Sequence, residues 1–148
     1  MLALIQRVSS AEVKVDGKLI AEIDQGILAL IGIEKGDSKA DARRLCERLL
    51  GYRIFSDNED KMNLSLKRIN GGLLLVPQFT LAADTQKGTR PSFSSAEDPD
   101  LSKMLFEYFC QYCSEQYPKV TTGLFGADMK VSLCNQGPVT FMLKVSNQ

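Results

Sequence analysis

The sequence predicts a single α+β domain, in which two main helices lie on a mostly antiparallel, barrel-like β-sheet. Three observations support this prediction. Segments of alternating apolar and polar residues occur at both ends of the chain, two segments with helical spacing lie between them, and the run GILALIGI at residues 26–33 is entirely apolar. The 148 residues contain no repeat, low-complexity tract or convincing linker, so we assign residues 1–148 to one domain.

The first third of the chain is expected to form strands. A short apolar strand at residues 2–5 ends in polar residues that could approach a site. A second strand reaches Val15 and precedes Asp16-Gly17, a dipeptide typical of a two-residue hairpin turn. The apolar run 26–33 then predicts a central strand that is covered on both faces.

Two amphipathic helices are expected next. Ser38 and Asp41 have the spacing of a capping box, and Gly51 offers a stop for the first helix. Asp98 and Pro99 fit the cap and first position of the second helix. Its expected apolar stripe, which we assign to the core, consists of Leu101, Met104, Leu105, Tyr108, Phe109 and Tyr112.

Smaller features separate and follow the helices. Residues 53–55 are a short strand candidate, and SDNEDKMN resembles a calcium loop only superficially, so we interpret it as a solvated turn. Residues 129–133 and 139–145 alternate again, which predicts two final strands joined by a turn at residues 135–138.

The window LLLVPQFTLAADT at residues 73–85 is where we expect a site. Four apolar residues predict a buried strand, and Pro77 then removes a backbone donor. Gln78 and Thr80 place polar groups at the end of this strand, where sites are often built. The following loop is long and polar, and its Lys87 and Arg90 could contact phosphate or simply be solvated.

Composition excludes several kinds of chemistry. Eighteen basic and eighteen acidic residues cancel, which argues against a broad electrostatic grip on nucleic acid and against a DNA partner, but not against contact with the end of an RNA. The chain has no histidine, so it cannot use a histidine base, a Ser-His-Asp triad or histidine metal ligands. No apolar run approaches the roughly 18 residues that span a membrane, and the start lacks the features of a signal peptide. We expect a cytoplasmic protein.

The four cysteines do not predict a metal or redox site. Cys110 and Cys113 form a C-x-x-C pair near the end of an expected helix, whereas thiolates are favoured at a helix N-terminus. A zinc site would need a second ligand pair, and Cys46 and Cys134 are far apart in sequence. We interpret all four as small buried apolar side chains and expect no metal and no cofactor.

The residues alone leave two chemical interpretations of residues 78–80. The hydroxyl of Thr80 is a candidate nucleophile, although it has no histidine to activate it. Alternatively, backbone N–H groups at Phe79 and Thr80 stabilise a developing oxyanion, a role that requires no particular side chain. Gly137-Pro138 reads only as a turn, and trans is the expected isomer from the residues alone.

Several segments, in order along nearly the whole chain, resemble the D-aminoacyl-tRNA deacylases. They are ALIQRV, YRIFSD with KMNLS, QFTLAADT with RPSF, TGLFGADM, and NQGPVT. The motifs QFTL and N-x-GPVT are specific in combination. The resemblance implies a cytoplasmic homodimer that hydrolyses the ester between a D-amino acid and the terminal adenosine of tRNA. It also implies removal of glycine mischarged on alanine tRNA.

The resemblance assigns roles to particular residues. It implies that Gly137-Pro138 is cis, enters the partner subunit's active site and rejects an L side chain by sterics. Gln78, Phe79 and Thr80 line the site, with the Phe79 amide as oxyanion donor, and the 2′-hydroxyl of the terminal ribose assists catalysis. The remaining matches are Arg7, which helps fix the Gly-Pro loop, and Phe125, Gly126, Ala127 and Met129, which wall the adenosine and amino-acid pocket.

One position departs from the family pattern, and two rival functions remain. The usual motif is S-Q-F-T-L, and Pro77 replaces the serine, which removes a hydroxyl and a backbone donor. We expect retained activity with an altered rate. The rivals are a threonine-dependent esterase or peptidase that acts through Thr80, and a non-catalytic module that binds tRNA or a nucleotide without releasing amino acid.

Overall fold

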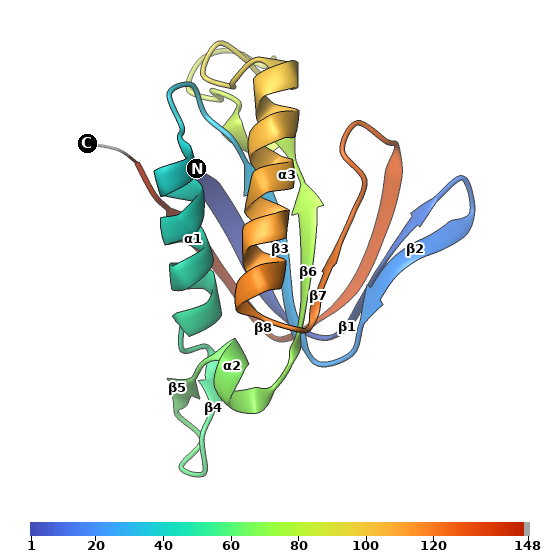
Figure 1. The fold of residues 1–148 in the computed structure, drawn as a ribbon, viewed down its shortest axis with the longest axis vertical. Coiled ribbons are helices and arrows are strands. Elements are labelled where there is room, and N and C mark those ends of the chain that lie inside the picture. The colour runs from blue at the N-terminus through green and yellow to red at the C-terminus, as the bar shows by residue number, and fades with distance from the viewer. Residues whose placement is uncertain (147–148) are drawn as a thin grey trace.

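The structure is a computed structural model that describes residues 1–146. Two long helices run side by side across one face of a curled sheet (Figure 1). The elements are β1 (Leu2–Val15), β2 (Lys18–Ile23), β3 (Gly26–Gly32), α1 (Lys39–Gly51), β4 (Phe55–Ser56), β5 (Met62–Leu64), α2 (Leu66–Ile69), β6 (Gly72–Pro77), the 3₁₀ helix η1 (Phe79–Ala82), α3 (Pro99–Gln116), β7 (Val120–Thr122) and β8 (Met129–Lys144).

The main sheet has the order β2-β1-β3-β6-β7, and β8 pairs with β1. The strands on either side of β1 are antiparallel to it, whereas β3, β6 and β7 are parallel neighbours. The first half of β1 pairs with β3 and the second half with β2, while β8 follows both halves on the other side. Because β1 pairs with different strands along its two halves, the sheet bends until it nearly closes. The expected barrel-like α+β fold with two main helices is thus confirmed.

Strands β1 and β8 are longer than the sequence predicts. We expected a strand at residues 2–5 separate from the one that ends at Val15, but β1 continues between them. The expected turn at residues 135–138 is also wrong, because β8 keeps its direction through this segment. Gln6 pairs with Thr140 and Val8 with Asn135, so four residues of β8 bulge out opposite one residue of β1.

The turn and helix starts that we predicted are confirmed. Asp16 and Gly17 have φ values of 50° and 77°, as the hairpin turn between β1 and β2 requires. Ser38 and Asp41 form both hydrogen bonds of a capping box at the start of α1. Asp98 caps α3, and Pro99 is its first residue. The short strand expected at residues 53–55 is displaced to β4, where it pairs with β5.

The buried face of α3 differs from the expected stripe. Leu101 and Met104 are 52% and 66% exposed, so their assignment to the core was wrong. The buried positions are Ser102, Phe106, Phe109 and Cys113. Their spacing of four, three and four residues defines a face rotated relative to our stripe, because α3 packs against both the sheet and α1.

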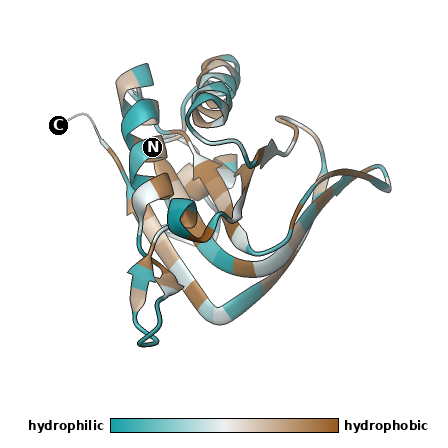
Figure 2. Cartoon of the chain, turned by 60° about the horizontal axis from the view of Figure 1, so that its bottom comes forward, coloured by the Kyte–Doolittle hydropathy of each residue, from teal (hydrophilic) through white to brown (hydrophobic). Residues whose placement is uncertain are grey.

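Apolar residues gather between the helices and the sheet, where Figure 2 shows the brown segments of the strands. Strand β3 lies between β1 and β6 and has six buried residues out of seven, which confirms the expected central strand. A second, smaller cluster, which includes Val8, Val13 and Leu74, fills the inside of the bend. Among residues 1–146, no helix is long and apolar enough to cross a membrane.

Candidate active site

A cavity of about 920 Å³ opens where the parallel strands β3 and β6 end. The segment that leads into α3, α3 itself and the segment that leads into β8 complete its walls. Strand ends that meet at one edge of a sheet commonly form a binding crevice. Six of the ten predicted site residues line this cavity, namely Gln78, Phe79, Phe125, Gly126, Ala127 and Met129.

Pro77 ends β6 without breaking its pairing to β3. Along β6 the backbone N–H groups alternate in direction: those of Gly72 and Gln78 donate to the β3 side, and that of Leu73 donates to Lys119 beside β7. Pro77 therefore faces the β7 side, beyond the last residue of that strand. The strand end is instead held by the Gln78 N–H, which donates to the Ile31 carbonyl at 2.8 Å.

After Pro77 the chain enters the 3₁₀ helix η1. The first N–H groups of any helix have no partner within it, and the Gln78 side chain does not cap this one. The Gln78 amide instead donates to the hydroxyl of Thr80. Phe79 is 62% exposed beside the cavity, and Thr80 is not among the lining residues. Phe79 therefore borders the cavity, whereas Thr80 does not.

Two aromatic pairs shape the cavity. The rings of Phe79 and Phe93 lie 5.3 Å apart between centroids at its mouth, and those of Phe106 and Phe125 lie 6.1 Å apart. Gly126, with φ of 81°, turns the chain behind Phe125. Phe93 and Phe106 were missed as cavity residues. Phe93 ends the family segment RPSF, which could have indicated it, whereas the local pattern of Phe106 does not distinguish it from a core residue.

Carboxylates also line the cavity, but two of them already have structural roles. Asp98 accepts hydrogen bonds from the backbone of Asp100 and Leu101 at the start of α3. Glu97 accepts from the Asp98 and Gly36 backbones at 2.9 and 3.3 Å. These bonds fix the entry to α3, so neither group is a free general base. The sequence suggested Asp98 only as a helix cap and did not indicate Glu97.

The other four predicted residues lie outside this cavity. Gly137-Pro138 has a cis peptide bond and is exposed in the bulge of β8. The middle of β8 lies at the lower edge of the main sheet in Figure 1, whereas β6 ends toward the top. Arg7 holds the bulge, since its Nε donates to the Gln136 carbonyl at 3.0 Å and one terminal nitrogen donates to Ile54 at 2.8 Å.

The bulge has further internal supports. The Asn135 side chain accepts from the Val139 N–H at 2.9 Å and donates to the Thr140 hydroxyl at 2.8 Å. Gly137 has φ of 137°, and a Cβ there would lie 2.7 Å from a Val139 methyl and 3.1 Å from the Arg7 guanidinium. Only glycine fits this position. The sequence-based assignment of Arg7 to the Gly-Pro loop therefore has a direct geometric counterpart within one chain.

The cysteines are free thiols. Cys46 and Cys113 are buried between α1 and α3, and the hydrogen bond to Cys46 together with burial raises the pKa of Cys113. Burial raises the pKa of Cys110 to about 12. Cys134 is exposed, so the expectation that all four are buried was wrong for this residue. Within residues 1–146, no cluster of three or more cysteine, aspartate or glutamate side chains is placed to hold a metal ion.

Known proteins resemble this chain over almost its full length. The family model described as D-Tyr-tRNA(Tyr) deacylase matches residues 4–144. The D-aminoacyl-tRNA deacylase of Photorhabdus laumondii is 57% identical over 145 residues, which cover 98% of this chain and 100% of the relative. The enzyme of the same name from Pectobacterium atrosepticum is 56% identical over 144 residues, which cover 97% and 99%.

Two solved structures share the fold. The c-Myc DNA unwinding element binding protein superposes with a TM-score of 0.95 at 32% identity, and the match covers 99% of this chain and 100% of that one. A probable eukaryotic D-amino acid tRNA deacylase gives a TM-score of 0.81 over 97% and 98% of the two chains. At 18% identity, the second match bears on the fold alone.

The family model and the named relatives thus place this chain among the hydrolases of the aminoacyl ester bond. The chain belongs to the D-Tyr-tRNA(Tyr) deacylase family. The family and the enzyme class expected from the motifs are therefore confirmed.

Proposed function

We propose that the protein hydrolyses the ester that links a D-amino acid to the terminal adenosine of tRNA, releasing the free amino acid and tRNA. The observation that carries the proposal is the pair of half-sites in one chain. The cavity holds Gln78 and Phe79, while Gly137-Pro138 is held rigid and exposed away from it. Each half is incomplete alone, and a two-fold dimer would join them.

A homodimer is accordingly part of the proposal. In an isologous pair, the bulge of each chain would enter the cavity of the other, so both sites would be completed by one interface. The face of the sheet opposite α1 and α3 offers apolar surface for such a contact. Leu4 pairs with Met142 on one side and Leu30 on the other, and Met142 is 49% exposed. The expected tRNA partner would present only its aminoacylated 3′ end to this site.

Chirality would be selected by exclusion. The carbonyl groups of the partner's Gly137-Pro138 would face the substrate's α-carbon on the side that an L side chain occupies. An L-aminoacyl ester is then rejected by collision rather than by weaker attraction. Glycine has no side chain to reject, so glycyl-tRNA, including glycine mischarged on alanine tRNA, would also be a substrate.

The proposed chemistry uses backbone and substrate rather than a side-chain base. Water attacks the ester carbonyl, and the Phe79 amide stabilises the resulting oxyanion at the cavity rim. The 2′-hydroxyl of the terminal ribose assists, and the 3′-oxygen leaves as the alcohol. This route suits a chain without histidine, whose cavity residues Glu97 and Asp98 are engaged at the start of α3. We propose that the reaction needs no cofactor and takes place in the cytoplasm, where aminoacyl-tRNA is made and used.

Deacylation of D-tyrosyl-, L-tyrosyl- and glycyl-tRNA, measured in parallel, tests the proposal. We expect hydrolysis of the D and glycyl esters and little of the L ester. Hydrolysis of the L ester at the D rate would contradict steric rejection. Binding of tRNA without release of amino acid would favour the alternative function, a non-catalytic binding module.

A further inference from the structure

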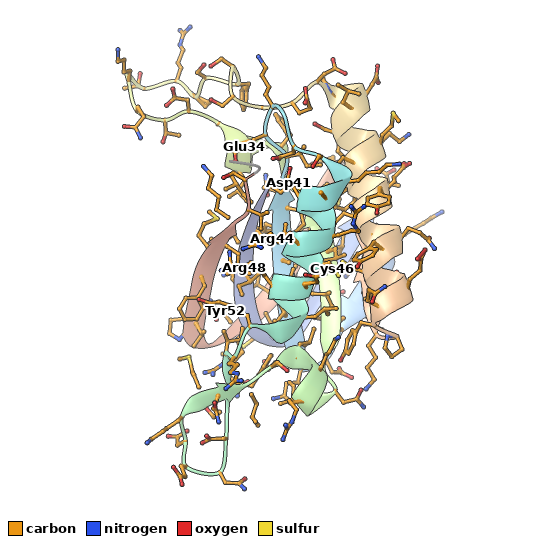
Figure 3. All side chains as sticks on the ribbon, turned by 60° about the vertical axis from the view of Figure 1, so that its left-hand side comes forward. Glu34, Asp41, Arg44, Cys46, Arg48 and Tyr52 are labelled. Atoms are coloured by element: carbon orange, nitrogen blue, oxygen red, sulfur yellow. The ribbon has the colours of Figure 1, made fainter. Side chains whose placement is uncertain are left out.

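The loop between η1 and α3 carries two cations that the proposed chemistry does not use. Residues 85–92 contain Lys87 and Arg90 and no acidic residue. Both cations are exposed, and within residues 1–146 neither takes part in an ion pair. Figure 3 shows this loop standing out from the top of the molecule, above the labelled Glu34.

The base of this loop is fixed to the mouth of the cavity. Asp84 and Ser92 exchange two backbone hydrogen bonds of 2.7 and 3.0 Å, which close residues 85–91 into a lobe. The next residue, Phe93, lines the cavity and contacts the ring of Phe79. Three residues span at most about 11 Å, so the Cα atom of Arg90 lies within that distance of the Phe93 Cα.

The loop also has local features that favour an open, outward shape. Asp84 accepts a hydrogen bond from the Gln86 N–H at 2.9 Å, and Gly88 adopts a φ of 69°. Arg90 precedes Pro91, which restricts it to extended conformations. The two cations therefore stand on a shaped lobe at the rim rather than on the cavity wall.

The charge inside the cavity makes such a rim useful. The cavity lining contains one cation, Lys35, against the carboxylates Glu97, Asp98 and Asp128. A polyanionic nucleic acid strand would gain little electrostatic attraction from this lining, and the whole chain has no net charge. Cations at the mouth of the cavity would instead bind the phosphates of the strand, while only its last nucleoside enters the cavity.

From this arrangement we infer that Lys87 and Arg90 form a clamp for the phosphates that precede the terminal adenosine of the tRNA. The inference rests on the proposed function, because it assigns a second binding region to the same substrate. The clamp would contribute to binding and not to the chemical step. It would act only on substrates that carry those phosphates.

The test compares two D-tyrosyl esters, one on tRNA and one on free adenosine, which has no phosphate. The variant is Lys87→Ala/Arg90→Ala. The matched control is Lys61→Ala/Lys67→Ala, which removes two exposed cations at the β5–α2 end of the molecule. We expect the loop variant to raise KM for the tRNA ester about tenfold at unchanged kcat, the loss typical of two exposed charge contacts.

Two further readouts separate a clamp from a structural role. A plot of the logarithm of kcat/KM against the logarithm of salt concentration has a negative slope. In the loop variant this slope should become less negative by about 1.4, the value expected for the loss of two phosphate contacts to a single strand. Hydrolysis of D-tyrosyl-adenosine should not change. A loop variant with the parent's KM and salt dependence would overturn the clamp, as would an equal loss on both esters. A parent that hydrolyses neither ester would refute the proposed function and the clamp with it.

Discussion

The Arg7 guanidinium joins the Gln136 carbonyl to the Ile54 carbonyl, with donor–acceptor distances of 3.0 and 2.8 Å. One side chain therefore fixes the bulge of β8 against the segment that precedes β4. A cation shared by two carbonyls makes stronger hydrogen bonds than a neutral donor would. The position of Gly137-Pro138 depends on this link more than on the sheet, whose pairing is interrupted there.

Removing this link should lower activity. For Arg7→Ala we expect kcat/KM on D-tyrosyl-tRNA to fall about 10- to 100-fold, the range expected when a charge-assisted hydrogen bond is lost at a site. Arg48→Ala is the matched control, because the Arg48 guanidinium also donates to a carbonyl, that of Lys144, away from the bulge. Equal losses in both variants would show that Arg7 acts only on general stability.

Replacing Pro77 by serine should have a small effect. The missing donor of Pro77 faces the β7 side, where Gly123 follows the last residue of β7 and its N–H donates to the Leu75 carbonyl at 2.8 Å. A serine N–H at position 77 would therefore add at most one hydrogen bond, to the next carbonyl along this segment. We expect Pro77→Ser to change kcat/KM on D-tyrosyl-tRNA by no more than about fivefold, roughly the value of one hydrogen bond. If the parent is inactive and Pro77→Ser restores activity, this expectation is contradicted.

Thr80 should be dispensable as a nucleophile. Its hydroxyl accepts from the Gln78 amide and does not line the cavity. We expect Thr80→Ala to keep measurable turnover, Thr80→Ser to remain close to the parent, and no acyl-enzyme to be trapped. A tRNA that lacks the terminal 2′-hydroxyl should not be hydrolysed. Complete loss in Thr80→Ala together with a trapped acyl-enzyme would establish the threonine-dependent esterase instead.

Gly26 should not tolerate a side chain. It pairs with Gly72 between the parallel strands β3 and β6, and a Cβ would lie 1.9 Å from the Gly72 carbonyl oxygen. We expect Gly26→Ala to lower the free energy of unfolding by about 3 kcal/mol or more, measured by urea denaturation. Gly51→Ala is the control, since its Cβ meets nothing within 4 Å, and it should be neutral or slightly stabilising.

The helix-packed thiols should resist alkylation. Burial raises the pKa of Cys110 to about 12, and the hydrogen bond to Cys46 together with burial raises that of Cys113, so these thiols stay protonated at pH 8. The same hydrogen bond lowers the pKa of Cys46, but Cys46 is fully buried and out of reach of the reagent. In a Cys134→Ser variant, mass spectrometry should find no iodoacetamide adduct on folded protein at pH 8. Three adducts are expected after unfolding in guanidinium. Rapid modification of folded protein would show that the packing of α1 on α3 opens readily.

The sequence predicted local structure where local chemistry decides it. Ser38 with Asp41, Asp16 with Gly17 and the apolar run of β3 were all placed correctly, because a cap, a turn and a buried strand follow from a few adjacent residues. The face of α3 was wrong, since Leu101 and Phe106 are equally apolar and only the position of α1 selects between them.

The residues of the candidate site also fall into those that a local pattern or motif indicates and those that only the fold brings together. Gln78 was found because a buried strand ends there in polar residues, and Phe79 because the backbone leaves the strand at that point. Residues 125–127 and Met129 were found through the family motif. Phe93 ends the family segment RPSF but was given no role, Glu97 belongs to no motif, and only the folded chain brings both to the cavity. The bulge at Gly137 could not be distinguished from a turn, because the pairing with β1 that keeps β8 straight involves residues about 130 positions away.

The pairing of β1 with β8 has a consequence for synthesis and folding. These strands come from opposite ends of the chain, yet they lie together along most of their lengths. Contacts so distant in sequence form late, and a nascent chain cannot complete them until β8 has left the ribosome. Until then Arg7 has no Gln136 to hold, and the cavity lacks the wall that Met129 supplies. A chain cut short before β8 would therefore lack the Gly137-Pro138 half of the site and part of the cavity wall, so incomplete products should be inactive.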